Sequence, residues 1–374
     1  MKKTLAYVAI TFGVVGVIAI LVSSDKQQNS QNSISNEPIK IGYVGPLTGE
    51  AASIGSINKA AIELAVDEIN AKGGVNGAML SVIYEDGKCS SAAASAAQKL
   101  MSIDRVSIII GECSPEIASF GPTAMQNKVL VLSPLASAPK LSNLGSYFFR
   151  TYPSDSNQGK FAAEYAYSTL GSRTAAILYH KNDWGAGIEE VFKKRFQELG
   201  GSISIDDGYA SEARDYRTSL TKIASAKPDM VFMPLFPEGG RIAVKQAQEL
   251  GISQPILGAD AWDEPVFKKE AVYAGTLLFT APTTPIPDEF KVKMVAKTGK
   301  DELPVGTTQS YDTIYLLAEA IKNVGLDTTR LAEELHRMTY SGIIGPISFD
   351  ANGDITTASY AVSQIKDGTT VKVK

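Results

Sequence analysis

The feature that most constrains the fold is an alternation of strands and helices that starts after residue 38 and starts again after Pro153. In the first series, strands are expected at 39–44, 79–84, 107–110 and 129–132, and helices at 56–71, 91–103 and 115–127. In the second series, strands are expected at 175–179, 202–205, 230–233, 255–257 and 275–279, and helices at 156–170, 187–199, 216–225 and 239–250. Continuous apolar strands separated by helices indicate parallel sheets covered by helices on both faces.

Two such series predict an α/β protein with two lobes. The chain of 374 residues is long enough for two domains. No Pro/Ser-rich linker separates the series, so the lobes are expected to be closely coupled. Further helices at 310–323 and 328–338, and strands near 346–349 and 360–365, must be shared between the lobes. The chain is therefore expected to cross between the lobes more than once.

The N-terminus has the pattern of an export signal. Lys2 and Lys3 precede an apolar run from Leu5 to Val22, and a stretch rich in Ser, Asn and Gln follows. The run approaches the length that spans a bilayer, and no cysteine follows it. Residues 1–24 are interpreted as a cleaved signal peptide or an uncleaved membrane anchor, with 25–38 as a polar linker. A buried N-terminal helix is the alternative. Both main interpretations place the folded part outside the cytoplasm, in the periplasm or at the cell surface, with membrane contact only through the N-terminal segment.

Composition excludes several functional classes. The net charge of -4 argues against nucleic acid as a partner, because binding phosphate requires a basic surface. Only His180 and His336 are histidines, which excludes a three-histidine zinc site and leaves few bases for a nucleophile. The sequence also lacks the HExxH, GxSxG, GxxxxGK[ST] and CxxC motifs. We therefore expect no catalytic residue, metal site or cofactor, and we interpret both histidines as surface or packing residues.

The chain has two cysteines, Cys89 and Cys113. Outside the cytoplasm, an even number of cysteines indicates a disulfide. The alternative is two unpaired thiols.

Ligands of open parallel α/β sheets bind beyond the carboxyl ends of the strands. This rule selects seven segments as the expected rim of a crevice: 46–55, 86–90, 111–115, 133–139, 180–185, 234–238 and 259–263. Both cysteines lie in these segments, so a disulfide would join two loops of the crevice.

The segment Gly111–Pro115 follows a strand and opens a helix. Ser114 suits the N-cap position and Pro115 suits the first helical position. The free N–H groups and the positive end of such a helix favour an anion, such as a ligand carboxylate. Plain helix capping without a ligand is the alternative.

Three further segments offer ligand contacts. The turn-rich loop Ser133–Pro139 presents the Ser137 hydroxyl to a ligand. The alternative is an ordinary loop between a strand and a helix, without a ligand contact. Asp260 would suit an ammonium group opposite an anion site, and capping is its alternative role. Trp184 and Phe236 follow strands of the second lobe and would cover an apolar ligand side chain, or they pack the lobe.

Several segments together resemble the type I periplasmic binding proteins of the leucine/isoleucine/valine-binding (branched-chain amino acid) family. The matching text is IKIGYVGPLTGEAASIG, KAAIELAVDEINAKGGVNG, YEDGKCS, IIGECS, LSPLASAPKL, FFRTYPSDSNQG and GPISFDANGDI. These segments occur in the family's order, and the likeness covers residues 39–370.

The resemblance implies two Rossmann-like lobes with parallel-rich sheets, joined by three crossover hinge segments near Thr151–Pro153, Thr280–Pro285 and Gly345. On this basis, the N-terminal lobe comprises 39–152 and 283–344, and the C-terminal lobe comprises 153–282 and 345–374. The family's lobes close on the ligand by hinge motion.

The resemblance also implies roles for residues of the first lobe. The family's disulfide matches Cys89 and Cys113, and its carboxylate-binding serine matches Ser114. A loop that contacts the ligand through backbone and hydroxyl groups matches Leu135 and Ser137.

In the second lobe, the family's ammonium-binding acid matches Asp260, which is shorter than the glutamate of branched-chain receptors. Tyrosines of those receptors match Trp184 and Phe236, and a tyrosine of the first lobe is replaced by Ile54. The α-amino-acid end of the site is thus retained, whereas the side-chain pocket differs.

The resulting expectation is an extracytoplasmic substrate-binding protein of an ABC transporter. It would capture a branched-chain or related amino acid, such as leucine, and deliver it to a membrane permease. The alternatives are a ligand-sensing module of the same fold, a binding protein for an amide or aromatic acid, and an extracellular hydrolase that uses His180.

Overall fold

The computed structural model describes residues 37–373. Residues 1–24, interpreted above as a signal peptide or membrane anchor, lie outside this range, as do nearly all residues of the expected linker 25–38. Between residues 37 and 373, no helix combines the length and the apolar composition needed to cross a membrane.

The first sheet has the strand order β2-β1-β3-β4-β5, and every neighbouring pair is parallel. Its strands are β1 (Ile39–Gly45), β2 (Leu80–Asp86), β3 (Ile108–Gly111), β4 (Leu130–Ser133) and β5 (Phe148–Arg150). The apolar run of β3 is buried on both faces: Ile108 and Ile110 pack in one core cluster, whereas Ile109 packs in another. The first cluster includes α1 (Ala52–Ala71), α9 (Asp288–Thr298), α10 (Thr307–Val324) and α11 (Thr328–Arg337). The second includes α2 (Ala93–Ser102) and α3 (Ser114–Gln126).

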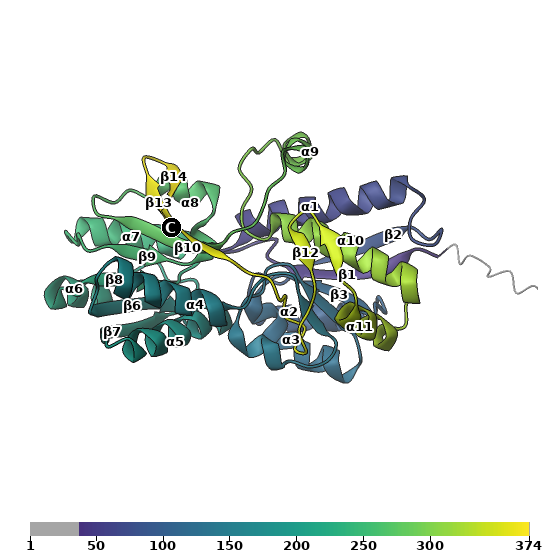
Figure 1. Cartoon of the computed structure of the whole chain (residues 1–374), viewed down its shortest axis with the longest axis horizontal. Coiled ribbons are helices and arrows are strands. Elements are labelled where there is room, and N and C mark those ends of the chain that lie inside the picture. The colour runs from purple at the N-terminus through teal and green to yellow at the C-terminus, as the bar shows by residue number, and fades with distance from the viewer. Residues whose placement is uncertain (1–36, 374) are drawn as a thin grey trace, which may run out of the picture. The chain divides into compact units, whose positions relative to one another are not determined.

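The second sheet has the order β14-β13-β10-β9-β8-β6-β7. The neighbouring strands β7, β6, β8, β9 and β10 are parallel, and β13 and β14 are antiparallel additions at one edge. In Figure 1, the yellow C-terminal strand β13 lies beside the green β10. The strands are β6 (Thr174–His180), β7 (Ser202–Tyr209), β8 (Met230–Met233), β9 (Ile256–Gly258), β10 (Leu277–Pro282), β13 (Tyr360–Lys366) and β14 (Thr369–Lys372).

Helices also cover both faces of the second sheet. One core cluster includes α4 (Asp155–Glu164) and α5 (Asp183–Glu198). The other includes α6 (Arg217–Ala226), α7 (Pro237–Glu249) and α8 (Pro265–Glu270). The predicted fold class, an α/β protein with two lobes and parallel-rich sheets, is confirmed. We call the parts built on the first and second sheets the first and second lobes.

The predicted elements are found with small shifts at their ends. The predicted helix 156–170 becomes α4 followed by a π-helical turn at Tyr165–Thr169. The predicted strand near 346–349 is β12 (Gly345–Ile347), which pairs with β11 (Tyr340–Gly342) in a separate hairpin. Within the described part of the chain, five α-helices and β-strands were not predicted, namely β5, α8, α9, β11 and β14, and neither were the 3-10 turns at Pro139–Asn143 and Asp260–Trp262.

The third crossing between the lobes was expected near Gly345, and the contacts of the segment from Gly345 to Tyr360 favour a later position in the chain. Ile347 and Phe349 belong to the core cluster of the first sheet, and Arg150 donates its backbone N–H to the carbonyl of Gly353 at 2.9 Å. The strand β13, which begins at Tyr360, pairs with the second sheet. We therefore propose that this crossing lies at 357–359 and that 345–356 belongs to the first lobe. The other expected boundaries remain a proposal.

Candidate functional site

A cavity lies at the carboxyl ends of the parallel strands of both sheets. Its empty space is about 410 Å³, with the open mouth included. Its lining residues are Ala51, Ile54, Cys89, Glu112, Cys113, Ser114, Pro115, Leu135, Ser137, Trp184, Phe236, Asp260, Ala261 and Val305. Each of the seven segments selected by the strand-end rule contributes at least one of them, and Val305 alone among these residues lies outside those segments. All six ligand-binding residues expected from the sequence line this one cavity.

One wall of the cavity is formed by the disulfide between Cys89 and Cys113, whose Cα atoms are 5.2 Å apart. The buried carboxylate of Glu116 accepts hydrogen bonds from the backbone N–H groups of both cysteines, at 2.9 and 3.0 Å. The disulfide and Glu116 therefore hold the loop after β2 against the start of α3.

The N-cap residue of α3 is Cys113, with Ser114 as the first helical residue. The prediction that Ser114 caps the helix is wrong, because Glu116 and Cys113 form the capping box and leave the serine hydroxyl to other partners.

This disulfide yields a stability prediction. Replacing both cysteines by serine is expected to lower the free energy of unfolding by about 3 kcal/mol, because the 24-residue separation restricts the unfolded chain. Urea denaturation of the oxidised wild type and the double variant measures the difference. Dithiothreitol should bring the wild type to the stability of the variant and leave the variant unchanged. A double variant as stable as the oxidised wild type would contradict the prediction.

Ser114 and Ser137 lie side by side, and their hydrogen bonds differ in direction. The Ser114 hydroxyl oxygen accepts from the backbone N–H groups of Ser137 and Ala138, at 3.1 and 3.0 Å. Its own hydrogen is not used in either contact, so Ser114 can donate to an anion at the start of α3. The Ser137 hydroxyl donates to the Asp155 carboxylate at 2.8 Å, which leaves its oxygen as an acceptor. The geometry thus fits Ser114 to a carboxylate and Ser137 to an ammonium group.

Asp260 lies in a 3-10 turn directly after β9 and is 3% exposed. Its Oδ2 accepts the hydroxyl hydrogen of Tyr152 at 2.6 Å, and its Oδ1 has no hydrogen-bond partner. Burial raises the pKa of Asp260 to about 6, against the hydrogen bond from Tyr152, which lowers it. The carboxylate is therefore ionised at neutral pH and has one oxygen available to a cation.

Asp155 is a second buried acid, and the sequence analysis did not select it. It lies in the first turn of α4, behind Ser137, and is fully buried. Its Oδ1 also has no hydrogen-bond partner. Burial and then the charge of Asp260 raise the pKa of Asp155 well above its usual value. Two neighbouring buried acids, each with an unpartnered oxygen, form a site that a cation would stabilise.

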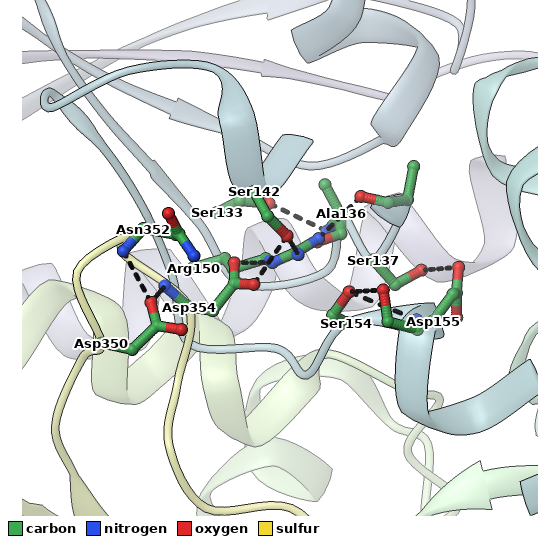
Figure 2. A network of polar contacts seen from close by, with 12 residues as sticks. Ser133, Ala136, Ser137, Ser142, Arg150, Ser154, Asp155, Asp350, Asn352 and Asp354 are labelled. Atoms are coloured by element: carbon green, nitrogen blue, oxygen red, sulfur yellow. Dashed lines mark hydrogen bonds and ion pairs between the residues drawn. The ribbon is translucent and has the colours of Figure 1, made fainter. Parts of the chain in front are cut away.

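Arg150 at the end of β5 fixes the loop that carries Ser137. Its guanidinium is fully buried, and it donates to the carbonyl of Ala138 at 3.0 Å, to the Ser142 hydroxyl at 2.7 Å and to Asp354 at 2.6 Å. Figure 2 shows this network and the adjacent contact between Ser137 and Asp155. Because Arg150 spans the loop and the turn at 350–354, it positions Ser137 without lining the cavity.

An aromatic wall closes the side of the cavity formed by the second lobe. The rings of Trp184 and Phe236 stack with centroids 5.1 Å apart and an interplanar angle of 7°. His180 lies behind them: its Nδ1 accepts the backbone N–H of Phe236 at 3.1 Å, and burial lowers its pKa to about 3. His180 does not line the cavity, and the exposed His336 packs on Phe149. Both histidines thus occupy packing or surface positions.

Comparison with known proteins identifies the family. The sequence profile of the family described as periplasmic binding protein matches residues 38–370. The chain belongs to this family. Its members bind substrates, and this membership fits the extracytoplasmic location expected from the N-terminal segment.

Individual relatives extend over nearly the whole chain. A leucine-, isoleucine-, valine-, threonine- and alanine-binding protein of Pseudomonas aeruginosa is 28% identical over 357 residues, which cover 91% of this chain and 94% of the relative. A leucine-binding protein, LivK, of Thermotoga maritima is 27% identical with a TM-score of 0.82, covering 90% of this chain and 98% of the other. A branched-chain amino acid transporter substrate-binding protein, LivJ, of Streptococcus pneumoniae in complex with isoleucine is 26% identical with a TM-score of 0.79, covering 90% and 100%.

Proposed function

We propose that this chain is the extracytoplasmic substrate-binding protein of an ABC transporter and that it captures an α-amino acid. The arrangement of Ser114, Ser137 and Asp260 around one cavity carries the proposal. A hydroxyl donor at the start of α3 suits the ligand carboxylate, and an acceptor oxygen beside a buried acid suits the ligand ammonium. Relatives named for leucine, isoleucine and valine binding support this ligand class.

The charges around the cavity favour a zwitterion over a simple acid. Among the described lining residues, none is Lys, Arg or His, whereas Asp260 and Glu112 are acids. A ligand with a carboxylate and no ammonium would leave the buried Asp260, whose Oδ1 has no hydrogen-bond partner, without a counter-charge. This argues for an amino acid over an aromatic acid or amide, although the stacked pair of Trp184 and Phe236 suits an aromatic ring.

A titration of intrinsic tryptophan fluorescence tests the ligand class. Trp184 lines the cavity, whereas Trp262 is fully buried against Phe267 and does not line it, so Trp184 is the expected reporter. An L-amino acid should give a saturable response. The amine that lacks its carboxylate and the acid that lacks its ammonium should each bind at least about 100-fold more weakly, because unmatched buried polar groups are costly. Tighter binding of benzoate or an amide than of any amino acid would contradict the proposal.

The captured ligand is proposed to pass to a membrane permease, and the chain is proposed to have no enzymatic activity. The sensing alternative predicts that uptake persists when this protein is deleted, whereas the transport role predicts that deletion and loss of the permease abolish the same uptake. The hydrolase alternative requires His180 as a base, and its buried position behind Phe236 opposes that role. The N-terminal segment is proposed to export the chain or to tether it to the membrane.

A further inference from the structure

Glu112 is an acid in the cavity wall that the proposed amino-acid head group does not use. It lies between β3 and Cys113, is fully buried, and lines the cavity together with Leu135 and Val305. Its position two residues before Ser114 places the two Cα atoms within about 7 Å of each other. Glu112 and Ser114 therefore line neighbouring parts of the cavity, on the wall of the first lobe.

A polar network holds this carboxyl group from behind. Asn58 donates from Nδ2 to Glu112 Oε2 at 3.2 Å and to the carbonyl of Val305 at 3.3 Å. Ser310 on α10 donates to Oε1 at 3.5 Å. Gly306 adopts a φ of +82°, and a Cβ on it would lie 2.7 Å from Asn58 Nδ2 and 3.1 Å from Leu135 Cδ1. The network therefore adjoins the lining residues Leu135 and Val305.

In the hydrogen bonds from Asn58 and from Ser310, Glu112 is the acceptor. Burial raises the pKa of Glu112 to about 8, so the group is neutral at neutral pH and carries a hydrogen of its own. The long contact to Ser310 is a weak acceptor for that hydrogen. A buried donor without a good acceptor is unfavourable, and because Glu112 lines the cavity, a ligand there could supply one.

Apart from Glu112, the residues that line the part of the cavity expected to hold the ligand side chain are apolar. Trp184 and Phe236 form the wall of the second lobe, and Ile54 and Ala51 line the cavity from the first lobe. Glu112 is thus the polar feature of this wall that lies outside the contacts assigned to the ligand carboxylate and ammonium.

Resting on the proposed function, we infer that Glu112 selects α-amino acids whose side chain carries a neutral hydrogen-bonding group, a hydroxyl or an amide, over aliphatic ones of the same size. An oxygen on the ligand side chain accepts from the Glu112 carboxyl, whereas a methyl group at the same place leaves that donor unmatched. A site built to hydrogen-bond a ligand group discriminates strongly against the isostere that lacks it.

Isosteric ligand pairs test this inference. Calorimetric titration of the full chain at pH 7 compares threonine with valine and asparagine with leucine. The wild type should prefer the polar member of at least one pair by about tenfold or more. Glu112→Gln keeps a neutral hydrogen-bonding group and should keep the preference. Glu112→Met should lose or reverse it.

Controls separate selectivity from folding. Thermal unfolding followed by circular dichroism verifies each variant, and Glu112→Gln is the conservative variant if Glu112→Met is unstable. Equal or tighter binding of valine and leucine by the wild type would overturn the inference and leave the proposed function intact. So would tightest binding of a basic amino acid, or an unchanged preference in Glu112→Met. Absence of binding to any α-amino acid would overturn the inference and the proposed function together.

Discussion

The substitution Asp260→Asn is expected to weaken binding of the amino-acid ligand by at least about tenfold. Asp260 is buried, and its Oδ1 has no hydrogen-bond partner within the chain, so a ligand ammonium would form a charge-assisted contact there. Removing one member of a buried charge pair costs more than losing a neutral hydrogen bond. An asparagine would still accept from the Tyr152 hydroxyl, and its NH₂ group would then face the ammonium without attracting it. Calorimetric titration at pH 7.5 measures the loss.

Asp263→Asn is a matched control, because Asp263 is nearby on the same segment but pairs with Lys268 and does not line the cavity. Its affinity should equal that of the wild type. Asp260→Asn with unchanged affinity would remove Asp260 from the binding site.

The pH dependence of the wild type supplies a second readout for Asp260. The ligand ammonium requires an ionised carboxylate, and burial raises the pKa of Asp260 to about 6. Affinity should therefore be full near pH 7 and should fall as the pH is lowered through 6, because protons then compete with the ligand. Asp155, whose pKa burial also raises, titrates beside it, so Asp260→Asn should flatten this dependence without abolishing it.

The substitution Arg150→Met is expected to lower the free energy of unfolding by about 3–5 kcal/mol, because it removes one member of a buried ion pair and leaves Asp354 without its cation. Arg150 is fully buried, and the Asp354 side chain is 14% exposed. The variant would also leave the Ala138 carbonyl and the Ser142 hydroxyl without their donors. Methionine keeps much of the volume of the arginine stem, so the loss reports on the polar contacts more than on a cavity. Urea denaturation at pH 7 measures the effect.

The exposed Arg330 on α11 is the matched control. Arg330→Met should change stability by less than about 0.5 kcal/mol. A loss below about 1 kcal/mol in Arg150→Met would show that the network in Figure 2 contributes little to folding. If the variant remains folded, its ligand affinity should also fall, because the loop of Ser137 loses its anchor.

Much of the fold could be predicted from the sequence because its signals are local. The runs at β3, β4 and β8 are apolar throughout, as expected for strands buried on both faces. The elements that were missed lack such a signal. The strand β5 has only three residues, and α9 has Val292 and Val295 exposed, at 68% and 37%, which obscures its apolar face.

The seven candidate segments could also be predicted, since the carboxyl ends of parallel strands meet at one edge of a sheet. Which atoms in those segments act together could not. The contact of Tyr152 with Asp260 joins residues 108 positions apart, and that of Ser310 with Glu112 joins residues 198 positions apart. No local pattern records such a pair.

The sequence alone thus determined the strand–helix order, the rim of the cavity and five of its expected lining residues, to which the family resemblance added Leu135. These depend on hydrophobic periodicity and on the direction of parallel strands, which are properties of short segments. Only the tertiary structure decided the direction of the hydrogen bonds at Ser114 and Ser137, the pairing of Asp155 with Asp260, and the burial of Glu112. Hydrogen-bond donors and protonation depend on which distant groups exclude water from a side chain, and this is fixed only when the lobes are packed.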